Sequence, residues 1–550
     1  MTDIEIAESV KPQKIKNIAK NLGLKSSQIT TYGDYKAKIT KKFSPREDSK
    51  LILVTAINPT SAGIGKTTVS IGLADAMHAV GDSVCLALRE PSLGPVFGIK
   101  GGATGGGRSQ VIPMADINLH FNGDFHAITS ANNLLCSMID NHIYQGNELN
   151  IDENKVFFHR CLDLNDRALR SVTVAGTKGE TPRQDSFSIT SASEIMAIMC
   201  LSENLNDLKK RLGNILVALN KKGKPVFAKD LHIQDAMAIL LKDALLPNLV
   251  QTLEGTPAIV HLGPFANIAH GCNSIVATRT SMALAKYTVT EAGFGADLGA
   301  EKFFDIKCRV AGLKPNAVVL VATIQALKLH GGANSLNLKD ENVEAVKLGM
   351  GNLIRHINLI RNVYKLPLLV TLNKYTSDSE AEVDAVTNKL ATMNVDFAIN
   401  DAWTLGSSGA RQLAIKIKKL CEEDNSQFQF AYKLESSVEE KIKDIATKVY
   451  GAKGVIFSEL AQEKIREINK LKLDKLPICI AKTQYSLSDN KKLVGAPEGF
   501  EITIRDIEIR SGAGFLVAIA GDMMLMPGLG KVPAGVNMKI TNNGKISGLF

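Results

Sequence analysis

The residues from Asn58 to Thr68 are those whose types and order most clearly suggest chemistry. The run reads Asn-Pro-Thr-Ser-Ala-Gly-Ile-Gly-Lys-Thr-Thr, between an apolar stretch at 51–57 and a helix-like stretch at 69–77. A strand, a glycine-bearing turn and a helix start form an arrangement that binds nucleotide phosphates, because backbone N–H groups and the helix N-terminus face the anion. An ordinary structural turn is the alternative, because a bare Gly-Lys-Thr also begins helices by chance.

Two side chains of this loop have predicted roles. Lys66 would reach the outer phosphates, and the Thr67 hydroxyl could bind magnesium. The usual pattern has a glycine five residues before the second glycine, and this chain has Thr60 there. The predicted phosphate-binding residues are Thr60, Ser61, Ala62, Gly63, Ile64, Gly65, Lys66 and Thr67.

Arg89 follows a second apolar run at 84–88 and precedes a segment with seven glycines between 94 and 107. A guanidinium group is planar and always charged, so it can bind a carboxylate or an acyl phosphate through two parallel N–H bonds. Arg89 is therefore our candidate for binding a further anion beside the nucleotide phosphates. A surface ion pair between Arg89 and Glu90 is the alternative. The glycine segment is interpreted as a loop beside Arg89 that is too flexible for a core element. A mobile surface loop without a functional role explains the segment equally well.

The elements that must position these residues alternate between short apolar runs and helical segments. This alternation predicts an α/β fold with a P-loop NTPase-like, doubly wound and mostly parallel sheet. In such sheets ligands bind beyond the carboxyl ends of the strands, where Lys66 and Arg89 lie. The predicted strands are 51–57, 84–88, 258–261, 317–322 and 368–372.

Changes in composition along the chain predict three units. Residues 4–48 look like a helical, lysine-rich N-terminal arm, and the polar stretch from 143 has helical periodicity. Helices at 437–470 are followed by short strands. We expect a ligand-binding core with the candidate phosphate loop at 1–142 and 246–434, an inserted domain at 143–245 and a C-terminal domain at 435–550, the last two being smaller α+β domains.

Composition restricts the class of protein. The chain has 550 residues, 45% apolar and 22% charged, which is ordinary for a globular protein and too long for one core. A formal net charge of +9 is mild, so small anionic ligands explain it without nucleic acid. Eight isolated cysteines, an acidic N-terminus and no apolar run of about 18 residues predict a soluble, cytoplasmic protein without a membrane partner.

Further motifs extend along most of the chain. They include Arg-Glu-Pro-Ser-Leu-Gly-Pro at 89–95 and Gly-Phe-Gly-Ala-Asp-Leu-Gly at 293–299. With these motifs in order, the chain resembles the formate–tetrahydrofolate ligase family from about residue 50 to about residue 530. The motifs that carry the resemblance lie at 58–68, 89–102, 116–121, 123–128, 130–133, 165–169, 248–257, 263–271, 293–302 and 521–529.

The resemblance implies a reaction in which formate, ATP and tetrahydrofolate give 10-formyltetrahydrofolate, ADP and phosphate. It also implies a divalent metal, usually Mg²⁺, stimulation by K⁺ or NH₄⁺, and a homotetramer. Formate is a poor acyl donor until phosphorylation gives formyl phosphate, and the site must then hold two repelling anions with fixed cations and N–H dipoles. We expect Lys66 and the loop N–H groups on one side and Arg89 on the other.

The folate side of the resemblance rests on aromatic residues. Trp403, the only tryptophan, lies in a polar, glycine-rich loop, where the family carries its pterin-stacking tryptophan. The opposing wall would be Tyr375, and this chain has Tyr375-Thr376 where the family commonly has phenylalanine and proline. Ile64 stands where the family usually has glutamate. Phe294 could contact adenine, with packing as the alternative.

Glu90 and Asp124 are candidate acidic groups for a metal, a water molecule or the folate amine, and a solvated surface position explains each equally well. A lone histidine is more often structural than catalytic, so His120, His126 and His270 receive no proton-transfer role.

Two other functions remain open on the sequence. One is a ligase that activates a different small carboxylate, against which the pair Trp403 and Tyr375 argues. The other is a nucleotide-gated binding or assembly protein, which needs neither Arg89 nor the glycine segment.

Overall fold

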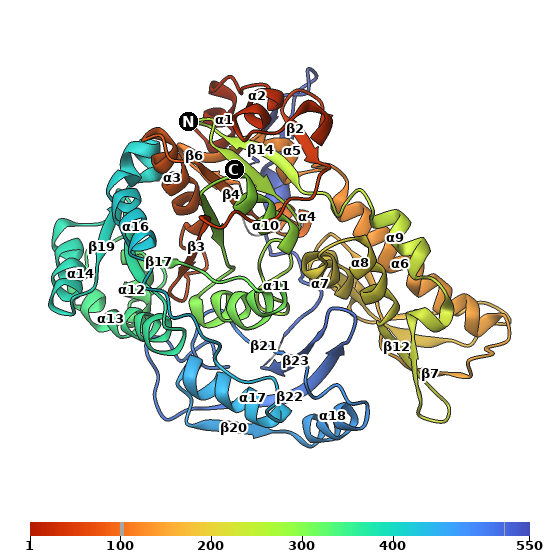
Figure 1. Cartoon of the computed structure of the whole chain (residues 1–550). Helices are drawn as coiled ribbons and strands as arrows, with labels where there is room; N and C mark the ends of the chain where they lie inside the picture. The colour runs from red at the N-terminus through yellow and green to blue at the C-terminus, as the bar shows by residue number, and fades with distance from the viewer. Residues whose placement is uncertain (99–103, 522, 550) are drawn as a thin grey trace.

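The computed structural model describes residues 1–98, 104–521 and 523–549. Figure 1 shows a central sheet surrounded by helices, with a second unit carrying β7 and β12 on one side and a third carrying β20 to β23 below. Positions 99–103 of the glycine segment and Asp522 of the last motif lie outside the described residues. Within the described ranges, no helix combines the length and apolar character needed to span a bilayer.

The central sheet is mostly parallel, as predicted. Its inner strands are almost completely buried, because both faces of a parallel sheet are covered, and they therefore appear in the sequence as continuous apolar runs. The parallel strands are, in spatial order, β15 (Pro257–Val260), β4 (Val84–Leu88), β16 (Tyr287–Glu291), β3 (Lys50–Ala56), β17 (Ala317–Ala322), β18 (Leu368–Asn373) and β19 (Phe397–Asn400).

The prediction of a wholly helical arm at 4–48 is wrong. The arm contains α1 (Asp3–Ser9) and α2 (Ile15–Asn21), but its second half forms the antiparallel pair β1 (Ile29–Tyr32) and β2 (Lys36–Ile39). β2 extends the central sheet by pairing with β14 (Asn248–Thr252), where Lys38 is the partner of Asn248. No local pattern reveals a pairing between segments so distant in the sequence.

The prediction that the glycine segment is a loop without regular elements is wrong for its described part. Residues 93–97 form helix α4, and β5 (Gly105–Gly106) and β6 (Ser109–Ile112) form a hairpin. A Cβ atom on Gly105 would lie 2.2 Å from the Ser109 carbonyl oxygen, and one on Gly107 would lie 2.1 Å from that of Trp403. These glycines therefore permit close backbone approach.

The two largest sheets outside the central one have three and four strands. The second unit has the antiparallel sheet β7 (Ile151–Val156), β12 (Leu216–Asn220) and β13 (Pro225–Phe227), beside helix α6 (Asp124–Tyr144), which crosses the predicted boundary at 142. The third unit contains β21 (Ile478–Ala481), β22 (Glu501–Arg510) and β23 (Phe515–Ala520). The domain boundaries stay a prediction.

The predicted helical stretch at 437–470 is interrupted. It contains α17 (Val438–Asp444), the π-helix η9 (Ile445–Tyr450) and α18 (Glu459–Lys470), with strand β20 (Gly454–Phe457) between them. β20 pairs in parallel with β22, so tertiary pairing overrides the helical pattern here.

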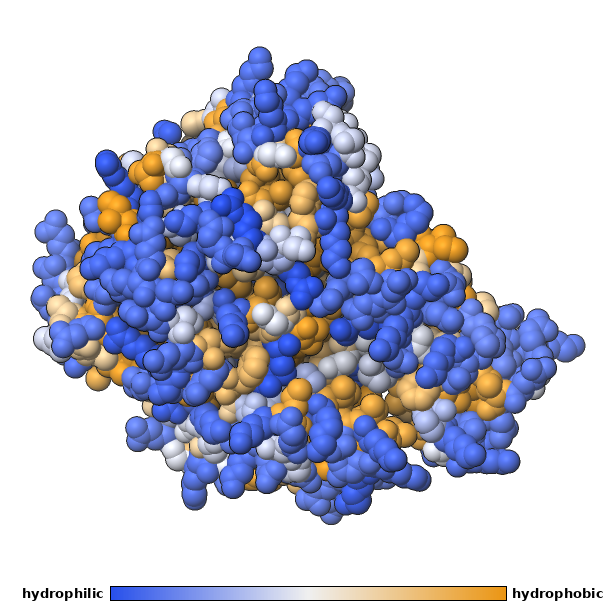
Figure 2. All heavy atoms as spheres, in the orientation of Figure 1, coloured by the Kyte–Doolittle hydropathy of each residue, from blue (hydrophilic) through white to orange (hydrophobic). Residues whose placement is uncertain are grey.

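One hydrophobic cluster runs through all three units, from Leu51 to Ala520. Figure 2 shows mostly hydrophilic side chains on the face it presents, with apolar side chains gathered in the hollows between the units. The C-terminal tail returns to the N-terminus, where Leu549 packs with Ile4.

Candidate active site

The loop at 60–65 forms a tight turn between β3 and helix α3 (Lys66–Ala79). The Gly63 N–H donates to the Thr60 carbonyl oxygen at 3.0 Å, and the Thr60 hydroxyl donates to that of Gly63 at 3.0 Å. Gly63 and Gly65 have φ values of 92° and 75°, which glycine adopts without steric cost. Thr60 has no such φ, and its hydroxyl closes the turn, which explains why glycine is not needed there.

Side chains that are distant in the sequence hold the start of this loop. Asn58 is fully buried; its Nδ2 donates to Asp297 Oδ1 at 3.0 Å, and its carbonyl oxygen lies 2.9 Å from His330 Nε2. Lys482, from the C-terminal unit, donates to Asp297 Oδ2 at 2.8 Å. Burial opposes ionisation of Asp297, but Lys482 and His356 outweigh it and lower the pKa of this carboxyl. The loop therefore leaves β3 from a fixed point.

The loop side chains differ in exposure. Ser61 and Ala62 are exposed, Ile64 is buried in the hydrophobic cluster, and Lys66 and Thr67 are partly exposed in the first turn of α3. The apolar Ile64 side chain therefore points into the core, while the N–H groups of the turn and the cation of Lys66 remain near its surface. This arrangement suits an anion.

Thr67 has a partner that sequence reasoning missed. Its hydroxyl donates to Glu291 Oε2 at 2.9 Å, and Glu291 is the last residue of β16, next to β3 in the sheet. A hydroxyl and a carboxylate side by side are hard oxygen ligands of the kind that Mg²⁺ prefers. The only local signal was an acidic residue at the end of the alternating strand Tyr-Thr-Val-Thr-Glu.

Arg89 lies directly beyond β4, which neighbours β16, so Lys66, Glu291 and Arg89 come from adjoining strand ends. Its Nη1 lies 3.4 Å from the Pro264 carbonyl oxygen, and its buried Nε has no hydrogen-bond partner among the described residues. A Cβ atom on Gly293 would lie 3.0 Å from Nη1, so glycine leaves room for the guanidinium. Most of its donor capacity remains for a ligand.

Glu90 and Asp124 line one cavity of about 190 Å³, together with His120 and His126. The Asp124 oxygens accept hydrogen bonds from Lys38 at 2.8 and 3.0 Å and from Asn248 at 2.8 Å. Asp124 is therefore anchored in a buried ion pair, and neither acid is a solvated surface group.

Glu90 differs from Asp124 because its buried Oε2 atom has no partner in the part of the chain that the structure describes. Burial, and then the charge of Asp124, raise the pKa of Glu90 well above its usual value. A cation or a proton donor entering the cavity would stabilise its charged form. His270, the third histidine considered, is fully buried, and burial lowers its pKa to about 3, so it stays neutral.

Trp403 and Tyr375 lie beyond β19 and β18, which are adjacent parallel strands. The Trp403 side chain is 46% exposed, and its indole ring lies against Gly106 and Gly107 of the hairpin. Tyr375 is partly buried, and its hydroxyl is near Gly65. The sheet thus places both aromatic residues at the same edge as the phosphate loop.

Phe294 follows Glu291 in the turn that contacts Arg89. Its φ of 58° lies in the left-handed region, which bulky residues rarely adopt. Such outliers occur at functional sites, and this one sets a partly exposed aromatic ring beside the candidate anion site.

The geometry agrees with a family comparison. The family model for formate–tetrahydrofolate ligase matches residues 1–550, the whole chain. The chain belongs to the formate–tetrahydrofolate ligase family. It is therefore an enzyme that joins formate to tetrahydrofolate in an ATP-dependent reaction, and formate, ATP and tetrahydrofolate are its substrates.

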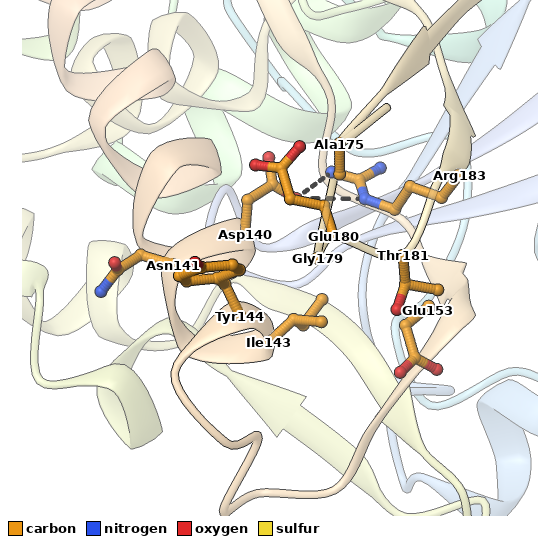
Figure 3. A pocket seen from close by; sticks show the side chains of 10 residues that line it. All are labelled: Asp140, Asn141, Ile143, Tyr144, Glu153, Ala175, Gly179, Glu180, Thr181 and Arg183. Carbon is orange, nitrogen blue, oxygen red and sulfur yellow. Dashed lines mark hydrogen bonds and ion pairs between the residues drawn. The ribbon is translucent and has the colours of Figure 1, made fainter. Parts of the chain in front are cut away.

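A second cavity, of about 210 Å³, lies in the second unit of this ligase. Figure 3 shows Arg183 reaching the carboxylate of Asp140 on α6, above the ring of Tyr144. Arg160 also donates to Asp140, at 2.6 Å. The charge of the Asp140 carboxylate is therefore neutralised by Arg160 and Arg183.

Among the described residues, no group of three or more His, Cys, Asp or Glu side chains could hold a metal by itself. The eight cysteines are buried, free thiols. A metal at the Thr67–Glu291 pair would need nucleotide phosphates or water to complete its ligands, as Mg²⁺ usually does.

Proposed function

We propose that this ligase works through formyl phosphate, formed at the strand ends that carry Lys66, Glu291 and Arg89. A formate oxygen attacks the γ-phosphorus of ATP, the bond from that phosphorus to the bridging oxygen breaks, and ADP leaves. The N10 amine of tetrahydrofolate then attacks the formyl carbon, phosphate leaves, and N10 loses its proton. The observation that carries the proposal is the pair of cationic side chains on adjoining strand ends, on either side of a hydroxyl–carboxylate pair.

In this proposal the loop N–H groups from Gly63 to Lys66 and the Lys66 ammonium bind the phosphates. Arg89 binds formate and then the acyl phosphate, where a fork of N–H donors offsets the repulsion between two anions. Thr67 and Glu291 would hold Mg²⁺, which neutralises phosphate charge as it develops. The core would then belong with doubly wound, P-loop NTPase-like sheets.

Glu90 and Asp124 would act at the neighbouring cavity. Asp124, held by Lys38, keeps a negative charge beside Glu90, and Glu90 could accept a proton or bind a cation. We propose Glu90 for that role over Asp124, because of these two acids only Glu90 has a buried oxygen without a partner among the described residues. The monovalent cation, K⁺ or NH₄⁺, has no assigned residues.

The pterin ring of tetrahydrofolate would stack between Trp403 and Tyr375, with Phe294 near the adenine of ATP. Partly exposed aromatic rings at the strand ends support this placement, since flat rings bind by stacking. A cytoplasmic homotetramer and the three-domain division are parts of the same proposal.

Positional isotope exchange tests the intermediate. ATP labelled with ¹⁸O in the β–γ bridge is incubated with Mg²⁺, with and without formate, in the absence of folate. If formyl phosphate forms reversibly, the label moves to non-bridging positions of the β-phosphate only when formate is present. Failure of the label to move, in a preparation that makes 10-formyltetrahydrofolate, would contradict the intermediate, with Lys66→Ala as the inactive control.

A further inference from the structure

Tyr375 lies between the two halves of the proposed site. It comes two residues after the end of β18, and its hydroxyl oxygen lies 3.8 Å from the position that a Cβ atom on Gly65 would occupy. Gly65 is the residue that precedes the first turn of α3, where the phosphates are proposed to bind. The polar end of a side chain assigned to the pterin wall is thus close to the phosphate loop.

Asn373 fixes this approach. Its Nδ2 donates to the Ile64 carbonyl oxygen at 3.4 Å and lies 2.4 Å from the same Cβ position on Gly65. Asn373 is buried, and Asn400 Nδ2 donates to its Oδ1 at 3.1 Å. The amide is therefore held against the Ile64–Gly65 peptide, and it determines where the loop lies relative to Tyr375.

The Tyr375 hydroxyl keeps its proton in this environment. Burial, and then Asp378, raise the pKa of Tyr375, whereas the Asn373 side chain lowers it by hydrogen bonding. Within the described part of the chain, the one hydrogen bond that Tyr375 donates comes from its backbone N–H, to Asp378 Oδ2 at 2.8 Å. The hydroxyl hydrogen is therefore left for a ligand or for water.

We propose that the Tyr375 hydroxyl donates a hydrogen bond to a phosphate oxygen of the nucleotide bound at Gly65 and Lys66. This rests on the proposed function, in which the same ring forms the pterin wall. Tyr375 would then contact both substrates, and a phenylalanine there could supply only the wall.

Tyr375→Phe tests the proposal because it removes one oxygen and keeps the ring. The dissociation constant for MgATP should rise about tenfold, since a hydrogen bond to a charged group is lost. The dissociation constant for tetrahydrofolate, followed by quenching of the single tryptophan, Trp403, should stay within twofold. Tyr144→Phe, at an exposed tyrosine of the second unit, is the matched control and should change neither constant.

Tyr375→Ala should weaken the binding of both substrates, because it removes the ring as well, and its thermal midpoint shows whether it folds. If Tyr375→Phe binds MgATP within twofold of the parent, or loses affinity only for tetrahydrofolate, the hydroxyl contacts no phosphate.

Lys66→Ala separates failure of this inference from failure of the proposed function. Loss of MgATP binding in Lys66→Ala, with none in Tyr375→Phe, would reject the hydroxyl contact alone. Unchanged MgATP binding in Lys66→Ala would reject the phosphate loop itself.

Discussion

The strand-end site and the cavity at Asp140 both combine acids, cations and an aromatic ring, but their charges are arranged differently. At Asp140 the carboxylate accepts from Arg160 and Arg183, so its charge is balanced within the protein. At the strand ends, Glu90 Oε2 and Arg89 Nε are buried without partners from residues 1–98, 104–521 and 523–549. Buried groups without partners cost free energy, so they persist where a ligand completes them, whereas balanced pairs support the fold.

Lys66→Ala should produce the largest loss of activity, in contrast to substitutions in the second unit. Removal of a cation that stabilises phosphoryl charge should lower kcat by about 10²–10³-fold without affecting the fold. The formation of 10-formyltetrahydrofolate is measured as methenyl absorbance after acidification. Lys222→Ala, at an exposed lysine of the second unit, is the control. Full activity in Lys66→Ala would mean that the phosphates bind elsewhere.

Trp403→Ala and Tyr144→Ala together compare an exposed aromatic ring at the strand ends with one at the second cavity. Loss of a stacking ring should raise the dissociation constant for tetrahydrofolate by about tenfold and leave that for ATP unchanged. Tyr144→Ala, also at an exposed ring, should change neither constant, as calorimetry can show. Equal weakening of both ligands by Trp403→Ala would instead indicate a structural tryptophan.

Asp75→Asn tests a buried carboxyl group that is only partly hydrogen-bonded, and Asp140→Asn tests one whose charge is balanced by arginines. Asp75 lies in α3, its Oδ2 has no partner among the residues that the structure describes, and burial raises its pKa to about 7. Unfolded Asp75 ionises near pH 4, so its contribution to stability is complete below that pH and is lost as the pH rises through about 7. Each pKa unit corresponds to roughly 1.4 kcal/mol.

The asparagine variant should therefore lose less stability than the parent between pH 5 and pH 8, as denaturant unfolding at both pH values can show. Asp140→Asn should leave this pH dependence as it is in the parent. Parallel stability curves for Asp75→Asn and the parent would show that Asp75 is ionised in the folded state.

Arg183→Ala should have the smallest effect on catalysis, with kcat/KM within about twofold of the parent. Its cost should appear as a lower thermal midpoint, because loss of a partly buried ion pair typically destabilises a protein by about 1 kcal/mol or more. A large loss of activity with an unchanged midpoint would place the second cavity in the reaction.

The sequence predicted local features well. The loop at 60–67 and the strands β3, β4 and β17 depend on glycine spacing and continuous apolar runs, which are visible within about ten residues. Lys66 and Arg89 could then be chosen as candidates because they follow predicted strands, and ligands bind at the carboxyl edge of a parallel sheet.

The features that the sequence did not reveal depend on pairing between distant segments. Glu291 meets Thr67 only because β16 lies beside β3, and Lys38 meets Asp124 only because β2 joins the sheet through β14. Asn373 was missed for the same reason, since its contact with Ile64 crosses 309 residues. Short-range patterns carry no information about such register.

The central claim is that the strand ends hold the nucleotide phosphates and formate together. A crystal structure with a non-hydrolysable ATP analogue, Mg²⁺ and formate tests it most directly. We expect the phosphates within hydrogen-bond distance of the Gly63–Lys66 N–H groups, and formate between the γ-phosphate and Arg89. A triphosphate bound away from both this loop and Arg89 would contradict the account.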